Sequence, residues 1–225
     1  MSTLPAHAPG RPVVAWHGTQ ASSAPLVVLL HGRGSDEREI AGLVPHLPDG
    51  PAYAAVRAPI AAAGGGYAWF ANRGIGRPVA ESLAQTLDWF RAWLDTVAPT
   101  GRPVVLVGFS GGAAFAGGLV LTDPDRYSGA AILYGTLPFE AGVPVTTGRL
   151  AGLPVFVAQG EQDTVIPREL LDATWAYLHT TSAANTTSRR DAGGHGLTAE
   201  TLQALQVWIR ARLGTDGVSS GPPRT

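Results

Sequence analysis

The sequence predicts an α/β fold in which a mostly parallel sheet is flanked by helices on both faces. Short runs of aliphatic and β-branched residues recur without polar alternation, which is typical of strands buried on both faces. Amphipathic stretches separate these runs, and such alternation of strands with helices is the pattern of α/β domains. The 225 residues are 45% hydrophobic and 15% charged, so we expect one domain with one sizeable core.

The expected strands are apolar runs that each end near glycine or proline: 26–30, 52–56, 103–107, 128–134 and 154–158. The expected helices are 37–47, 79–97, 112–122, 168–179 and 198–213. In the helix 79–97, Leu83, Leu87 and Phe90 recur every three or four residues, which predicts an apolar face that packs on the sheet. Asp36 and Glu39 form a capping-box pattern at the start of the first helix.

Both ends of the chain are expected to lie outside this domain. Residues 1–11 are expected to be flexible, and 214–225, rich in Gly, Ser and Pro, are predicted to be a disordered tail. The single domain then spans 12–213. The N-terminus lacks a positively charged stretch followed by an apolar one, and no run is long enough to span a bilayer. We therefore expect a cytoplasmic location and no membrane partner.

The composition excludes several classes of chemistry. The chain has no cysteine, which excludes disulfide bonds, a thiolate nucleophile and cysteine-ligated metals. It also has no lysine, so Schiff-base and pyridoxal chemistry and a Walker-type phosphate loop lack their key residue. The net charge is -1 and the arginines are scattered, which argues against nucleic acid as a partner. His31 has no second ligand at metal-binding spacing, so we expect a structural hydrogen-bonding role for it, no metal and no cofactor.

The segment GFSGG at 108–112 matches the GxSxG pattern of a nucleophilic serine. Ser110 follows the apolar run 103–107 and precedes a helix of small residues, the strand-to-helix context that exposes such a hydroxyl. The tail matches the same pattern around Ser219, but no predicted strand precedes that serine. An ordinary glycine-rich turn is the alternative for 108–112. We predict that Ser110 is the nucleophile.

A serine nucleophile needs a base and a carboxylate, which follow it in the order serine, acid, histidine in α/β hydrolases. His195 lies in the loop GGHG between a predicted strand and the last helix, and it is the predicted base. His179, the rival, ends an amphipathic helix. Asp163 follows the strand 154–158 and is the predicted acid, because the stiff stretch 164–167 beside it can fix its direction. Glu161, on the turn itself, is the competitor.

An oxyanion hole requires two N–H donors near the nucleophile. The predicted donors are the backbone N–H groups of Gly111 and of Arg33, which lies in the loop HGRG after the strand 26–30. The pair His17 and Gly18 imitates this motif, but it precedes the turn-like TQASSAP and is predicted to belong to an N-terminal hairpin.

Four motifs together resemble the phospholipase/carboxylesterase family, which includes acyl-protein thioesterases: LLHGRGSDE at 29–37, GFSGG at 108–112, GEQDTVIP at 160–167 and GGHG at 193–196. The resemblance implies an α/β-hydrolase fold in which these motifs carry the oxyanion loop, nucleophile, acid and base. Many members have glutamine where this chain has Gly111, and leucine where it has Arg33. The stretch GGGYAWF at 64–70 resembles the aromatic lining of the family's acyl pocket, which implies substrate contact by Trp69 and Phe70; core packing is the alternative.

The expected function is that of a serine carboxylesterase, which hydrolyses small or short-to-medium acyl esters through an acyl-enzyme. No insertion is long enough for a large lid, which favours a small-molecule ester over a lipid droplet. The alternatives are an acyl thioesterase, a peptide hydrolase or a lysophospholipase-type enzyme with the same residues, or a non-catalytic ligand-binding protein of this fold. The family resemblance is also compatible with a homodimer.

Overall fold

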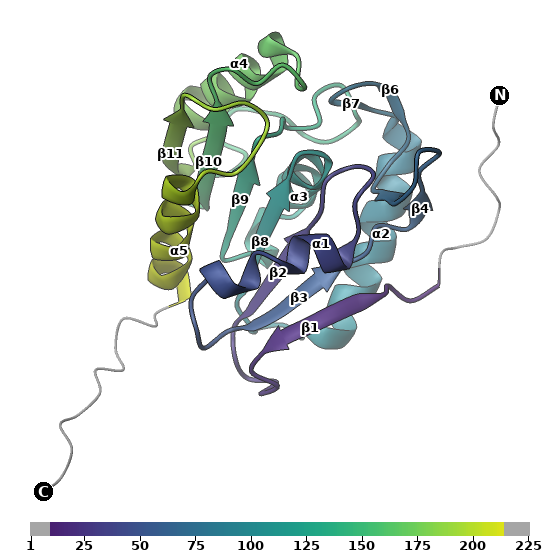
Figure 1. Ribbon diagram of the computed structural model, residues 1–225, viewed down its shortest axis with the longest axis vertical. Coiled ribbons are helices and arrows are strands. Elements are labelled where there is room, and N and C mark those ends of the chain that lie inside the picture. The colour runs from purple at the N-terminus through teal and green to yellow at the C-terminus, as the bar shows by residue number, and fades with distance from the viewer. Residues whose placement is uncertain (1–9, 214–225) are drawn as a thin grey trace, which may run out of the picture.

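The computed structural model describes residues 10–213, so the predicted tail at 214–225 and most of the predicted flexible segment at 1–11 lie outside the described residues. A seven-stranded sheet, in the order β1-β3-β2-β8-β9-β10-β11, forms the centre of the fold (Figure 1). Its strands are β1 (Val14–Gly18), β2 (Leu26–Leu30), β3 (Ala52–Val56), β8 (Val104–Phe109), β9 (Gly129–Leu133), β10 (Pro154–Gly160) and β11 (Asn185–Asp191). All neighbouring strands are parallel except β1, which is antiparallel to β3.

Helices cover both faces of this sheet (Figure 1). They are α1 (Glu37–Ala41), α2 (Ala80–Val97), α3 (Gly111–Thr122), α4 (Arg168–Ala176), which continues as a π-helical turn (Tyr177–Thr181), and α5 (Ala199–Leu213). Apolar side chains of α1 and α5 pack on one face, and those of α2 and α3 on the other. The predicted apolar face of α2 is confirmed, because Leu83, Leu87 and Phe90 are buried. Among residues 10–213, no helix combines the length and apolarity needed to cross a membrane.

The first helix is shorter than predicted. After α1 the chain continues only as a 3-10 turn at Val44–His46, because Pro45 lacks the N–H that an α-helix would require. The predicted capping box is confirmed in part. One Asp36 carboxylate oxygen accepts from the N–H groups of Arg38 and Glu39 at 2.9 and 3.0 Å, but among the described residues the Glu39 side chain accepts no bond from the Asp36 N–H. The start of α1, directly after the predicted oxyanion loop, is therefore fixed.

The predicted N-terminal hairpin is wrong. Strand β1, which carries His17 and Gly18, pairs with β3 and places His17 opposite Tyr53. The next strand in the chain, β2, is already paired on both edges, with β3 and β8. Because β2 has no free edge, β1 cannot form a hairpin with it and instead pairs with the outer edge of β3.

Two short ribbons that the sequence did not predict lie between β3 and α2. They are β4 (Ile60–Ala61) with β5 (Tyr67–Ala68), and β6 (Asn72–Gly74) with β7 (Arg77–Pro78). The first ribbon also pairs with the loop after β2, through a bridge between Ser35 and Tyr67. The ribbons therefore lie beside the carboxyl end of the sheet, where ligand sites form in parallel α/β folds.

Candidate active site

Ser110 lies in a sharp turn between β8 and α3, as predicted. Its φ of 54° and ψ of -114° are unusual for a residue other than glycine, and its N–H donates to Leu133 O at 2.9 Å. The flanking glycines are required by close backbone approach. A Cβ on Gly108 would lie 2.2 Å from Gly112 O, and one on Gly112 would lie 2.1 Å from Leu30 O. The turn therefore tolerates no side chain at either position.

The three side chains predicted to form a triad lie within hydrogen-bond reach of one another. Nε2 of His195 is 2.9 Å from Oγ of Ser110, and Nδ1 of His195 is 2.8 Å from Oδ2 of Asp163. The Asp163 side chain is fully buried and that of His195 is 15% exposed. Oδ1 of Asp163 accepts from the N–H groups of Val165 and Ile166 at 2.8 and 3.0 Å, so the stretch after it fixes the direction of the carboxylate.

The rival residues lie elsewhere. Glu161 is exposed on the turn after β10, while Asp163 contacts the histidine. His179 is exposed within the π-helical turn after α4, where its Nδ1 donates to Trp175 O at 2.8 Å and its ring stacks on that indole.

The two predicted oxyanion donors lie next to each other beside Ser110. A Cβ on Gly111 would be 3.3 Å from Arg33 N, so the two backbone segments are in close contact. Within residues 10–213 the Arg33 N–H donates to no acceptor. Gly111 is the first residue of α3, where an N–H has no intrahelical partner. This pair can therefore receive a developing negative charge. The Arg33 side chain is exposed, and its NH1 donates to Phe70 O at 3.3 Å.

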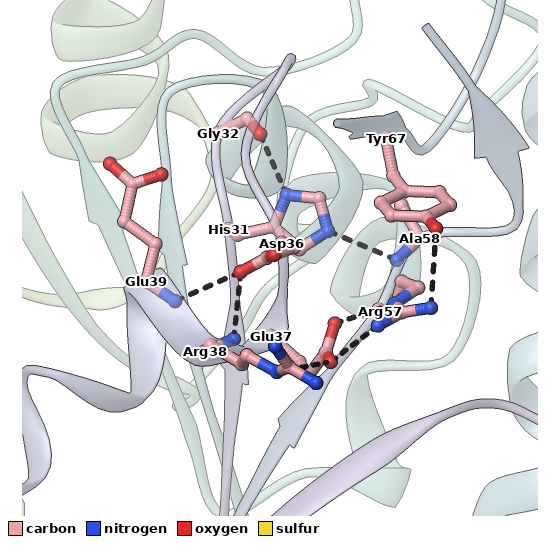
Figure 2. A network of polar contacts seen from close by, with 9 residues as sticks. All are labelled: His31, Gly32, Asp36, Glu37, Arg38, Glu39, Arg57, Ala58 and Tyr67. Carbon is pink, nitrogen blue, oxygen red and sulfur yellow. Dashed lines mark hydrogen bonds and ion pairs between the residues drawn. The ribbon is translucent and has the colours of Figure 1, made fainter. Parts of the chain in front are cut away.

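His31 is hydrogen-bonded to the Gly32 carbonyl (Figure 2). Its Nδ1 donates to Gly32 O at 2.7 Å, and its Nε2 accepts from Ala58 N at 3.0 Å. This pattern requires the neutral imidazole, and burial lowers the pKa of His31 accordingly. Gly32 C=O and Arg33 N–H belong to one planar peptide unit, so fixing the carbonyl fixes the direction of the N–H.

A partly buried ion pair between Glu37 and Arg57 lies beside the same loop (Figure 2). The Glu37 side chain is 3% exposed and accepts two hydrogen bonds of 2.6 Å from Arg57. These bonds lower the pKa of Glu37 and raise that of Arg57. Arg57 also lies over the ring of Tyr67, 4.6 Å from its centroid. The Tyr67 backbone in turn accepts from Gly34 N and donates to Ser35 O, both at 2.9 Å. The loop is thus tied to the first ribbon.

Ser110 opens into a pocket of about 600 Å³. Its lining comes from the oxyanion loop, α1, the second ribbon and the loops after β8, β9, β10 and β11, and includes Ile40, Leu43, Phe70, Asn72, Ile75, Thr136, Val165, Ile166 and Leu197. Phe70 thus lines the same pocket as Ser110. Trp69 lies outside this lining, since its buried ring stacks on Phe115 at 4.4 Å and its Nε1 donates to His31 O. Its geometry corresponds to the core-packing alternative.

Two residues that adjoin the site, Tyr134 and Asp191, carry no motif that predicts their role. Tyr134 directly follows β9 with a φ of 48°, and its buried hydroxyl donates to Asp191 at the end of β11. The available signal was a tyrosine at the end of the apolar run 128–134, immediately before a glycine.

A serine at an elbow after a central parallel strand, followed in the chain by an acid and a histidine, is the arrangement of α/β hydrolases. Within that class, a sequence profile of the phospholipase/carboxylesterase family matches residues 13–213, and the chain belongs to this family. The protein is thus a member of a family of carboxylic ester hydrolases.

Individual relatives have low sequence identity to this chain, but their alignments cover most of it. The MhqD protein of Bacillus subtilis (strain 168), whose name describes it as a hydrolase, is 26% identical over 199 residues, which cover 86% of this chain and 96% of MhqD. The crystal structure of a Bacillus cereus carboxylesterase has a TM-score of 0.78 at 23% identity and covers 89% of this chain and 94% of its own. The crystal structure of a carboxylesterase from Mesorhizobium loti has a TM-score of 0.72 at 24% identity and covers 82% of this chain and 88% of its own. Both structures share the fold.

Proposed function

We propose that this protein is a serine carboxylesterase that hydrolyses small or short-to-medium acyl esters through an acyl-enzyme intermediate. The observation that carries the proposal is the pair of hydrogen bonds joining Asp163 to His195 and His195 to Ser110 at the wall of the pocket. A hydroxyl becomes a competent nucleophile when a base accepts its proton, and the carboxylate holds that base in the required tautomer.

In the proposed reaction, Oγ of Ser110 attacks the ester carbonyl carbon while its proton passes to Nε2 of His195. The carbonyl oxygen becomes an oxyanion, which the N–H groups of Arg33 and Gly111 bind. As the carbon–oxygen bond to the alcohol breaks, the alcohol takes the proton from His195. Water then attacks the acyl-enzyme with His195 as base, releasing the acid and restoring Ser110. Asp163 stabilises the imidazolium in both steps.

The pocket supports an ester with an apolar acyl group of limited length. Its volume is about 600 Å³, within the usual range for small-molecule sites. Ile75 and Val165 line it and are 55% and 44% exposed, so they form an apolar rim that an acyl chain can cover. Such a rim favours neutral acyl chains over strongly polar ones.

The test is a panel of p-nitrophenyl esters from acetyl to lauroyl, with matched thioesters and amides. We expect turnover of the shorter esters, reduced by about 10⁴-fold or more in Ser110→Ala. Ser188→Ala, a substitution at an exposed serine of β11, is the matched control and should keep full activity. Faster turnover of the thioesters would reassign the enzyme as a thioesterase. Folded wild type without any Ser110-dependent turnover would instead support the ligand-binding alternative.

A further inference from the structure

The end of strand β9 lies directly against the turn that carries Ser110. Leu133 O accepts from Ser110 N at 2.9 Å, and a Cβ on Gly135 would lie 2.6 Å from Ser110 O. Tyr134, between these two residues, is fully buried and has a φ of 48°. A bulky residue rarely adopts this left-handed conformation, and it persists only where the surrounding structure enforces it. The strained residue therefore sits at the contact with the candidate nucleophile.

The Tyr134 side chain extends from this contact to the loop that carries His195. Its hydroxyl donates to Oδ2 of Asp191, to which Thr201 Oγ1 also donates at 3.2 Å. The other oxygen, Oδ1, accepts from Gly193 N at 3.0 Å. The carboxylate of Asp191 is thus shared between the sheet and the loop 192–196. Gly193 O in turn accepts from the N–H of Gln162 at 3.0 Å, next to Asp163 in the chain.

Aromatic packing also connects Tyr134 with His195. The ring of Phe109, the residue before Ser110, lies 6.1 Å from the Tyr134 ring and 5.3 Å from the His195 imidazole, measured between centroids. A buried hydroxyl needs a partner, and a carboxylate is a strong one. Burial and the adjacent Asp191 carboxylate raise the pKa of Tyr134, so its hydroxyl remains a donor across the neutral range.

We propose that Tyr134 is a positioning residue, which holds the loop 192–196 through Asp191 and thereby keeps Nε2 of His195 within reach of Ser110 Oγ. The inference rests on the proposed function, because it takes His195 to be the base. The two atoms are 2.9 Å apart, and a displacement of about 1 Å in such a pair can cost about 10²-fold in rate.

The experiment compares Tyr134→Phe, which removes only the hydroxyl, with Tyr177→Phe. Tyr177 is also buried, its hydroxyl donates to Thr146 O at 2.8 Å, and it lies outside the lining of the pocket. Tyr134→Phe is expected to lower kcat by about 10-fold to 10²-fold with little change in KM. Tyr177→Phe should lower the thermal midpoint by about as much as Tyr134→Phe does, but it should keep the wild-type kcat.

A double-mutant cycle tests whether the effect passes through His195. In the His195→Ala background, Tyr134→Phe should change the residual rate by less than about two-fold, because the group that it positions is gone. Asp191→Asn keeps the shape of the side chain but weakens its bonds to the Tyr134 hydroxyl and to Gly193 N. It should show the same loss of kcat and the same dependence on His195, and it replaces Tyr134→Phe in the cycle if that variant does not fold. Unchanged kcat in Tyr134→Phe, or an equal loss in the His195→Ala background, would overturn the proposal.

A readout without turnover separates this proposal from the proposed function. The His195 Nδ1 proton bonded to Asp163 should give a downfield proton NMR signal, assigned by its loss in His195→Ala. We expect this signal to broaden or vanish in Tyr134→Phe and to persist in Tyr177→Phe. If wild type lacked Ser110-dependent turnover, the proposed function would fail, and this signal would still decide the positioning role. A signal identical in wild type and Tyr134→Phe would refute it.

Discussion

Oδ2 of Asp163 lies 2.8 Å from Nδ1 of His195, while the other carboxylate oxygen is held by two backbone N–H groups. In Asp163→Asn the amide oxygen can keep the backbone bonds, but the amide nitrogen then faces Nδ1. The histidine must carry its proton on Nε2 instead, where it can no longer accept from Ser110. We expect kcat to fall by about 10³-fold to 10⁴-fold with a small change in stability.

The control for this substitution is Glu161→Gln, which changes the exposed carboxylate two residues earlier. Steady-state kinetics should show wild-type kcat in Glu161→Gln. Equal losses in both variants would mean that the assignment of the acid is mistaken.

The two hydrogen bonds of His31, to Gly32 O and from Ala58 N, predict different outcomes for two substitutions of this histidine. Asn places its amide nitrogen near the position of Nδ1 and can still donate to Gly32 O, whereas Gln places its amide oxygen near Nε2 and keeps only the bond from Ala58 N. The Gly32–Arg33 peptide is thus held in His31→Asn and released in His31→Gln. We expect His31→Gln to lose up to about 10²-fold in kcat, and His31→Asn clearly less.

Thermal unfolding of the two His31 variants provides the necessary comparison, since each loses one buried hydrogen bond. Losses of kcat that simply followed the loss of stability would contradict a role in orienting the Arg33 N–H.

The Glu37–Arg57 ion pair predicts how stability depends on pH. The folded pKa of Glu37 lies below its ordinary value of 4.5, so the pair stabilises the protein fully above that pH, and this contribution is lost as the pH falls through the lowered pKa. At neutral pH, Glu37→Gln should lower the free energy of unfolding by about 1–3 kcal/mol. The difference from wild type should shrink below about pH 4.5.

Urea denaturation of both proteins between about pH 7 and about pH 3 measures this difference. Glu39→Gln, an exposed change on the same helix, should have a small effect throughout. A difference that stayed constant down to the lowest pH would exclude the ionised pair as its source.

The apolar rim predicts a dependence on acyl-chain length. Ile75→Ser should raise KM for octanoyl esters by about 3-fold to 10-fold and leave acetyl esters almost unchanged, because only the longer chain reaches the lost apolar surface. Val207→Ser, at a similarly exposed residue of α5 outside this pocket, is the matched control. If Ile75→Ser affected all esters alike, the rim would not be part of the acyl site.

Much of the fold and site could be predicted because the relevant signals are local. Strands β2 and β3 have the predicted boundaries, since an apolar run bounded by turn residues marks a strand buried on both faces. Asp163 could be preferred to Glu161 because the stiff stretch after Asp163 is visible in the sequence.

The remaining features depend on tertiary neighbours. Tyr134 and Asp191 are 57 residues apart, and their contact exists only because the sheet order brings β11 close to the end of β9. The ribbons between β3 and α2 have strands too short to show a period. The residues Trp69 and Phe70 are adjacent, yet only Phe70 lines the pocket, a difference that composition does not determine.

The most direct test of the central claim is the reaction of the intact protein with a fluorophosphonate probe, read as intact mass. Phosphonylation requires an activated serine, so wild type should gain one adduct, while Ser110→Ala gains none and His195→Ala reacts far more slowly. Labelling of Ser110→Ala at the wild-type rate, or no labelling of folded wild type, would contradict the assignment of Ser110 as a nucleophile activated by His195.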